Sequence, residues 1–274
     1  MKSQLVGDKR LRDAVQALTP CGVAKASDDV VAELQSKHPG RSSPLPSFDK
    51  SACPPPLTLV SDDILKGIKH FPANTACGRD GLRANHLKQL VQPHINRDQL
   101  VEALSKFVNF VMAGNLPCDM AKFIASAPLT AIAKKDGGIR PIAVGEIYRR
   151  LVSRIANQKV LPQLATYLSP LQVGVGTRGG TEQAYFRFQD TLHKHGSTMG
   201  KVALFFDFKN AFNLCSRSKM FEEVRKHCPG ISAWVEFCYR DEPYLFFADN
   251  LLSNPTRGYA GAFVVFSHPS SLCS

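Results

Sequence analysis

The sequence lacks the features of membrane and secreted proteins. Its longest apolar runs, at residues 202–206 and 262–266, are far short of the ~20 residues that a membrane-spanning helix needs. No apolar core follows the first residues, so a signal peptide is not indicated. The eight cysteines form no CxxC pair, which argues against a zinc cluster, and a disulfide framework is not expected in a chain of 274 residues. We therefore expect an intracellular protein, in the cytoplasm or the nucleus, without membrane contact.

Repetitive and disordered classes are excluded as well. The 19 glycines and 18 prolines show no period, and no heptad pattern continues along the chain. An apolar content of 44% is typical of a globular protein rather than of a disordered one. The chain has too few acidic residues to balance its basic ones, with 23 Asp and Glu against 34 Lys and Arg, for a net charge of +11. This excess favours a polyanionic partner, above all nucleic acid, although a charge that only maintains solubility is the alternative.

The pattern of residues separates an N-terminal extension from the rest of the chain and predicts helices and strands along it. Residues 1–60 are predicted to be an N-terminal extension that ends in a Pro/Ser-rich linker at 39–56, where proline excludes regular helix and central strand. Periodicity predicts helices at 9–18, 28–34, 64–71, 82–90, 100–112, 147–160, 181–193, 219–226 and 232–238. Strands are predicted at 127–133, 139–143 and 202–206, and Asp80 is expected to cap the helix at 82–90.

The first candidate site is a basic β-hairpin. Residues 134–138 (KKDGG) supply the Asp and Gly residues that a tight turn requires, between the two strands predicted at 127–133 and 139–143. Lys134, Lys135 and Arg140 flank this turn, where three cations can neutralise a triphosphate. The predicted helix that follows carries Arg149, Arg150 and Arg154. The alternative is an ordinary solvated hairpin.

The second candidate is Asp207, which follows the apolar run at 202–206. That run is predicted to be a strand buried on both faces, and a carboxylate at its end is well placed to hold Mg²⁺ for nucleotidyl transfer. Phe212 would lie beside the same pocket, where its ring would exclude a ribose 2′-hydroxyl. The alternative is that Asp207 begins a turn and that Phe212 belongs to the core.

The third candidate is the glycine-rich segment 172–182 (QVGVGTRGGTE), which precedes a predicted helix. Glycine lets a backbone approach a phosphate closely, and a helix N-terminus favours an anion. It is not a Walker A loop, because no Gly-Lys-Ser/Thr follows at the required spacing.

In their order along the chain, these segments resemble the reverse transcriptase of non-LTR (LINE-like) retrotransposons. The resemblance runs from about residue 80 to about residue 254 and rests on 78–83 (GRDGLR), 134–142 (KKDGGIRPI), 172–182 and 206–212 (FDFKNAF). It implies a helix-rich α+β fold. Residues 61–254 would form the fingers and a partial palm of a right-hand polymerase, with a basic β-hairpin and an incomplete antiparallel palm sheet.

The resemblance also implies roles for individual residues. Lys134 (or Lys135) and Arg140 would contact the phosphates of an incoming deoxynucleotide, and Phe212 would select the sugar. Asp207 would be the first metal-binding aspartate, for Mg²⁺, with the backbone carbonyl of Phe208 beside it. The template and primer backbones, RNA and DNA respectively, would lie along Asp80, Arg149, Arg150 and Arg154, and Arg178 of the glycine-rich loop joins this group.

Three parts of the family pattern are not found in this sequence: a Gly-Gln-Gly segment, an aromatic-x-Asp-Asp hairpin and a thumb. We reject residues 247–250 (FADN) as the second metal hairpin, since they follow Asp207 too closely and end in Asn. Residues 255–274 have an aberrant composition, which a frameshift or a false exon boundary near residue 257 would explain. We therefore expect reverse transcriptase ancestry without polymerase activity in this chain. The alternatives are a non-catalytic module that binds RNA or RNA–DNA hybrid, and an unrelated basic protein with neither the hairpin nor a strand ending at Asp207.

Overall fold

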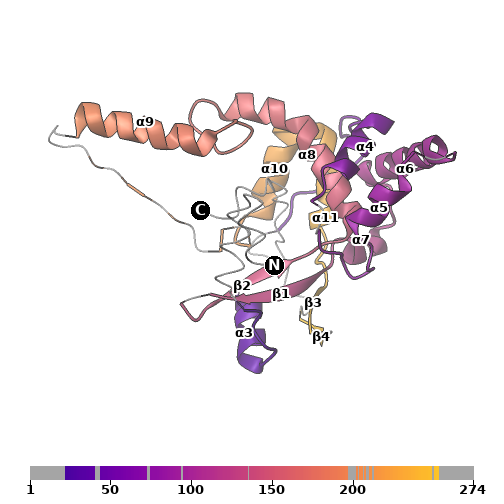
Figure 1. Cartoon of the computed structure of the whole chain (residues 1–274), viewed down its shortest axis with the longest axis horizontal. Helices are drawn as coiled ribbons and strands as arrows, with labels where there is room; N and C mark the ends of the chain where they lie inside the picture. Colours follow the sequence, from indigo (N-terminus) through magenta and orange to yellow (C-terminus); the bar gives the residue numbers. More distant parts are fainter. Residues whose placement is uncertain are drawn as a thin grey trace.

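The computed structural model describes residues 22–40, 44–72, 75–93, 95–134, 136–196, 213–248 and 250–252, with the single positions 202, 204, 205, 207, 210 and 211. The fold is helix-rich α+β, as the sequence predicts (Figure 1). Its helices are α3 (Asp28–Ser36), α4 (Ser61–Lys69), α5 (Ala84–Leu90), α6 (Arg97–Met112), α7 (Cys118–Ile124), α8 (Ile147–Leu168), α9 (Gly180–His195), α10 (Arg217–His227) and α11 (Ser232–Tyr239), with the short 3-10 helix η1 (Pro229–Ile231). Its strands are β1 (Ala127–Ala133), β2 (Ile139–Ala143), β3 (Leu245–Phe247) and β4 (Asn250–Leu251).

The strands form one sheet in the order β2-β1-β3-β4. β1 and β2 pair antiparallel, with Ala133 opposite Ile139, and have the limits that the sequence predicts. β3 pairs parallel to β1, so the sheet is mixed, and the expectation of an antiparallel sheet is wrong on this point. β3 follows β2 only after α8 to α11, so no hairpin turn dictates its direction, and it pairs parallel to β1 on the edge opposite β2.

The main core lies among the helices, around α8. Ile147, Leu151 and Ile155 of this helix are fully buried, and α8 packs against α4 and α6. The close approach of α4 requires glycine at position 67, since a Cβ there would lie 2.7 Å from the side chain of Ile155. α8 runs to Leu168, beyond the predicted end at residue 160, although Pro162 lies inside it. Leu164, in this extension of about two turns, packs on the same core and stabilises the longer helix.

A second core lies between α3 and the sheet. Leu34 of α3 is fully buried with Leu129, Ile139, Leu245 and Phe247 from three of the strands. In Figure 1, α3 lies below β1 and β2, and the helical body lies above them. The domain boundary expected at residue 60 stays a prediction, but part of the segment before it contributes to this second core.

The arm formed by residues 44–60 contains neither helix nor strand, as its prolines predict. Hydrogen bonds join the arm to the helical body. The backbone N–H of Leu57 donates to the carbonyl of Gly230 at 2.9 Å, and the side-chain amide of Asn109 bonds both the N–H and the carbonyl of Leu59, each at 2.8 Å. The arm therefore joins α6 to the turn before α11.

The strand predicted at residues 202–206 is wrong in the described residues. Val202, Leu204 and Phe205 are 81, 70 and 80% exposed and lie outside the sheet. An apolar run is stable as a central strand only where neighbours pair with both of its edges and layers cover both of its faces. In the described sheet β1 lies between β2 and β3, and those three residues pair with none of the strands. The predictions for residues 9–18 and 255–274 lie outside the described residues.

Within the described part of the chain, no helix is both long and apolar enough to cross a bilayer. Five described cysteines are free, and they differ in exposure: Cys215 is exposed, whereas Cys238 is buried.

Burial raises the pKa of Cys238 to about 12, and since the thiolate is the reactive form, the folded protein should protect this thiol. We expect iodoacetamide at pH 8 to modify Cys215 at least about 100-fold faster than Cys238 in the native protein, and both at similar rates in denaturant. Peptide-resolved mass spectrometry measures both rates. Similar native rates would show that α11 does not bury Cys238.

Candidate nucleotide and nucleic-acid site

The basic hairpin is formed by β1, β2 and the turn between them. The N–H of Lys134 donates to the carbonyl of Gly138 at 2.7 Å, and the Asp136 carboxylate accepts from the N–H of Gly138 at 3.1 Å. Gly137 has a φ of 82°, which explains glycine at this position. Lys134 and Arg140 are exposed on the two sides of the turn. Lys135 lies outside the described residues. The hairpin thus presents at least two cations to solvent.

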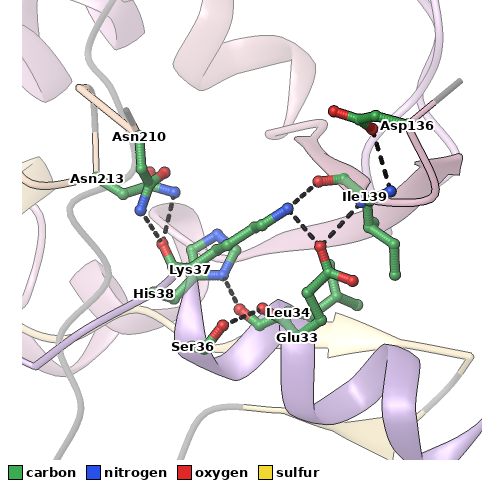
Figure 2. A network of polar contacts seen from close by, with 10 residues as sticks. Glu33, Leu34, Ser36, Lys37, His38, Asp136, Ile139, Asn210 and Asn213 are labelled. Atoms are coloured by element: carbon green, nitrogen blue, oxygen red, sulfur yellow. Dashed lines mark hydrogen bonds and ion pairs between the residues drawn. The ribbon is translucent and has the colours of Figure 1, made fainter. Parts of the chain in front are cut away.

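α3 binds the outer edge of this hairpin through two side chains (Figure 2). The Glu33 carboxylate accepts from the N–H of Ile139 at 2.9 Å and from the Lys37 ammonium at 2.6 Å. The same ammonium donates to the carbonyl of Ile139. The hydrogen bond from Lys37, followed by that from Ile139, lowers the pKa of Glu33, so the carboxylate is the form that binds the hairpin.

The loop that follows Asp207 is bound to the end of the same helix. The side-chain amides of Asn210 and Asn213 both donate to the backbone carbonyl of Lys37, at 2.8 and 2.9 Å (Figure 2). Asn210 has a φ of 55°, a left-handed conformation that Asn tolerates better than most residues. α3 therefore contacts both the basic hairpin and the loop of the predicted metal ligand.

Asp207 itself is exposed and does not end a strand. Among the described residues, no group of three or more His, Cys, Asp or Glu side chains is arranged to hold a metal ion. Phe208 and Phe212 lie outside the described residues. The role of Asp207 as a Mg²⁺ ligand stays a prediction.

The three arginines of α8 contact the protein itself. Arg149 donates to the carbonyl of Ala125 at 2.8 Å, and Arg150 donates to the carbonyl of Ala76 at 2.7 Å. The guanidinium groups of Arg150 and Arg154 lie over the ring of Phe71, at 5.7 and 5.1 Å from its centre. Burial lowers the pKa of both groups, and the nearby charge of Arg154 adds to the effect on Arg150. These contacts give the arginines a structural role that the sequence did not indicate.

Asp80 lies in an exposed turn and does not cap the next helix, contrary to expectation. Its carboxylate accepts from the N–H of Leu82 at 2.9 Å, within the turn, and α5 begins only at Ala84. The turn instead binds Glu146, whose carboxylate accepts from the N–H groups of Arg79 at 2.9 Å and Asp80 at 3.4 Å. Burial, and then the adjacent Asp80 carboxyl, raise the pKa of Glu146. Two carboxyl groups therefore lie beside each other at the start of α8.

The glycine-rich segment packs against its own chain. A Cβ at Gly180 would lie 1.7 Å from the carbonyl oxygen of Val173, so the backbone leaves no room for a side chain. A Cβ at Gly176 would lie 2.6 Å from the side chain of Ala165 on α8. Close packing thus explains these two glycines without a phosphate. Arg178 is exposed in this segment.

Sequence reasoning missed Glu33 and Lys37. A spacing of four residues favours an ion pair on a helix, but the helix predicted at 28–34 ends before Lys37. Nothing in the spacing indicates that both would bind residue 139, more than 100 positions later. Asn210 and Asn213 lie in or beside the motif at 206–212, but their target, the end of α3, was not foreseen.

No family model matches the chain. It is similar to the retrotransposable element SLACS 132 kDa protein of Trypanosoma brucei gambiense, with 25% identity over 179 residues. These residues are 65% of this chain and 14% of that protein, so the chain spans only a small part of its relative. The similarity supports a retrotransposon-related origin for the chain.

Proposed function

We propose that the chain derives from the reverse transcriptase of a non-LTR retrotransposon, an RNA-directed DNA polymerase, and that residues 61–254 correspond to its fingers and part of its palm. The observation that carries the proposal is the basic hairpin, which has the predicted limits and exposes Lys134 and Arg140. The similarity to a retrotransposon protein and the order of the four motifs support it. Residues 1–60 would be an extension, and residues 255–274 an aberrant tail.

In the proposed reaction, the basic hairpin binds the phosphates of a deoxynucleotide or of a nucleic acid. Lys134 and Arg140 lie at the two sides of a short turn, where both can neutralise one phosphate chain. Mg²⁺ held by Asp207 and further carboxylates would supply the two-metal transfer to a DNA primer on an RNA template. Asp207 is one carboxylate, whereas two metal ions need several. We therefore expect these 274 residues to bind nucleic acid without extending a primer.

The alternative function is a module that binds RNA or RNA–DNA hybrid without catalysis. The exposure of Lys134, Arg140 and Arg178 favours it, because phosphate contacts need accessible cations and no metal site. The partners in either case are RNA, a DNA strand and, for the enzyme, deoxynucleotides, which implies an intracellular location.

The hairpin can be tested by binding to single-stranded RNA. We expect the double variant Lys134→Ala/Arg140→Ala to bind about tenfold more weakly at 0.1 M salt, since two phosphate contacts are lost. The slope of log K against log salt should fall in magnitude by about 1.4, or ~0.7 for each contact. Fluorescence anisotropy over a salt series measures both quantities.

A matched control removes two lysines elsewhere. Lys106→Ala/Lys194→Ala removes the same number of charges from exposed ion pairs on α6 and α9, and should change the affinity far less. Equal losses in the two double variants would refute a specific role for the hairpin. Primer extension on the RNA template decides between the two functions: Mg²⁺-dependent extension that is lost in Asp207→Ala would show that the chain is active by itself.

A further inference from the structure

In the sheet that the described residues form, β2 is an edge strand, and the polar groups on its outer side need partners. Ile139 pairs with Ala133, and its own N–H and carbonyl point away from β1. In a larger sheet another strand would bind both groups. Here the Glu33 carboxylate accepts the N–H, and the Lys37 ammonium donates to the carbonyl, so one ion pair replaces a neighbouring strand at this residue (Figure 2).

Lys37 also binds the loop after Asp207, but through its main chain. Its carbonyl lies at the C-terminal end of α3, where carbonyl groups lack helical partners. The amides of Asn210 and Asn213 donate to it from the loop. The side chain of Lys37 is only 20% exposed, so this residue lies between the hairpin and the loop and contacts each by a different group.

We propose that Lys37, with Glu33, is a positioning residue that fixes the basic hairpin relative to the loop of Asp207. This inference rests on the proposed function for its purpose, but its geometry does not depend on that function. Ile139 directly precedes Arg140, and Gly138 is bonded to Lys134, so a hold on Ile139 restrains both cations. Residues 22–24 bond the β1 edge of the hairpin, through Ala24 and Ala133, and the ion pair of Glu33 and Lys37 bonds its β2 edge at Ile139. α3 lies outside the stretch that resembles reverse transcriptases, yet it joins the two segments that would carry nucleotide and metal.

The hypothesis differs from simple protection of a strand edge. Edge protection affects the hairpin alone, whereas positioning couples the hairpin to the loop. Coupling is reciprocal, so a variant that loosens the hairpin must also loosen the loop, and a variant that loosens the loop must also loosen the hairpin. Amide hydrogen exchange on the full chain can detect this, with peptides that cover residues 139–143 and 210–216.

The decisive variants change one contact each. Lys37→Met removes the ammonium, and we expect exchange to become roughly fivefold faster or more in both peptides. Lys37→Arg keeps the charge and should restore protection. Asn213→Ala removes one amide from the other end and should accelerate exchange at 139–143. Lys25→Met, the same change at an exposed lysine before α3, is the matched control and should alter neither peptide.

A peptide from the buried part of α8 excludes general unfolding, because it should stay protected in every variant. If Lys37→Met does not fold, Asn213→Ala alone gives the answer. Faster exchange confined to 139–143 in Lys37→Met, or unchanged exchange there in Asn213→Ala, would overturn the proposal.

RNA affinity separates this inference from the proposed function. We expect Lys37→Met to weaken binding of single-stranded RNA about threefold relative to Lys25→Met. A less ordered hairpin loses more conformational entropy when it binds RNA, and this loss lowers the affinity. Unchanged affinity, with coupled exchange, would reduce the ion pair to a structural role and refute positioning. If Lys134→Ala/Arg140→Ala also leaves the affinity unchanged, it is the proposed function that fails.

Discussion

Replacing Glu236 with alanine is expected to lower the free energy of unfolding by about 3–5 kcal/mol, the usual cost of removing one partner from a buried ion pair. The Glu236 side chain is 3% exposed and binds two arginines, Arg225 through one carboxylate oxygen and Arg240 through the other, at 2.6 Å. Both guanidinium groups lie over the ring of Phe48, at 5.3 and 5.6 Å from its centre. Without the carboxylate, two like charges would face each other in a partly buried site. Urea unfolding followed by circular dichroism measures the change.

A control variant and a second measurement test this prediction for Glu236. Glu222→Ala removes an exposed ion pair with Lys219 from α10, and should cost less than about 1 kcal/mol. Arg240 also donates to the carbonyl of Pro46 at 3.0 Å, so the Glu236 variant should release the arm that carries Phe48. Faster amide exchange at 44–50 would show this. A cost as small as that of Glu222→Ala would mean that the network does not stabilise the fold.

Replacing Trp234 with alanine is expected to cost about 3–5 kcal/mol as well, but for a different reason. Trp234, the one tryptophan of the chain, is completely buried in the helical core. Its ring stacks on Phe237, and its indole N–H donates to the hydroxyl of Ser153 on α8 at 3.1 Å. Alanine would leave a large cavity between α8 and α11. The same unfolding experiment measures the loss.

Phe110→Ala is the matched control, because this aromatic side chain on α6 is 47% exposed and its removal opens no buried cavity. The hydrogen bond can be tested separately. Ser153→Ala leaves the buried indole N–H without its partner and should cost about 1–3 kcal/mol. Trp234→Phe combined with Ser153→Ala removes both partners and should cost less than the sum of the two single changes. A Trp234→Ala loss no larger than that of Phe110→Ala would contradict the observed packing.

Elements that depend on contacts between residues close together in the sequence were predicted accurately, whereas those that depend on distant residues were not. β1 and β2 were predicted with their observed limits because a two-strand unit with a DGG turn is specified by neighbouring residues. Most helices were predicted to within a few residues, since the spacing of apolar side chains reflects the face that is buried. The prediction that Asp80 caps a helix was wrong. An aspartate can bond either the first turn of a helix or a tight turn, and because α5 begins only at Ala84, Asp80 bonds its own turn.

The candidate site was less predictable. The cations of the hairpin were evident from the sequence, but the partners of Arg149, Arg150 and Arg154 were not. In a sequence, these arginines have the appearance of a nucleic-acid surface, and in the structure they hold Ala125, Ala76 and Phe71. Replacing all three would therefore change stability as well as any binding of RNA. The hairpin variants give the cleaner test.

The local elements, the excess of positive charge and the resemblance to retrotransposon proteins are evident in the sequence, because each depends on residues close together or on composition. How those elements pair depends on tertiary contacts. They set β3 parallel to β1, leave residues 202, 204 and 205 exposed, and bring Lys37 between Ile139 and Asn213. Such contacts join residues that are 100 or more positions apart, and their energies depend on which surfaces meet. No periodicity in the chain encodes that choice.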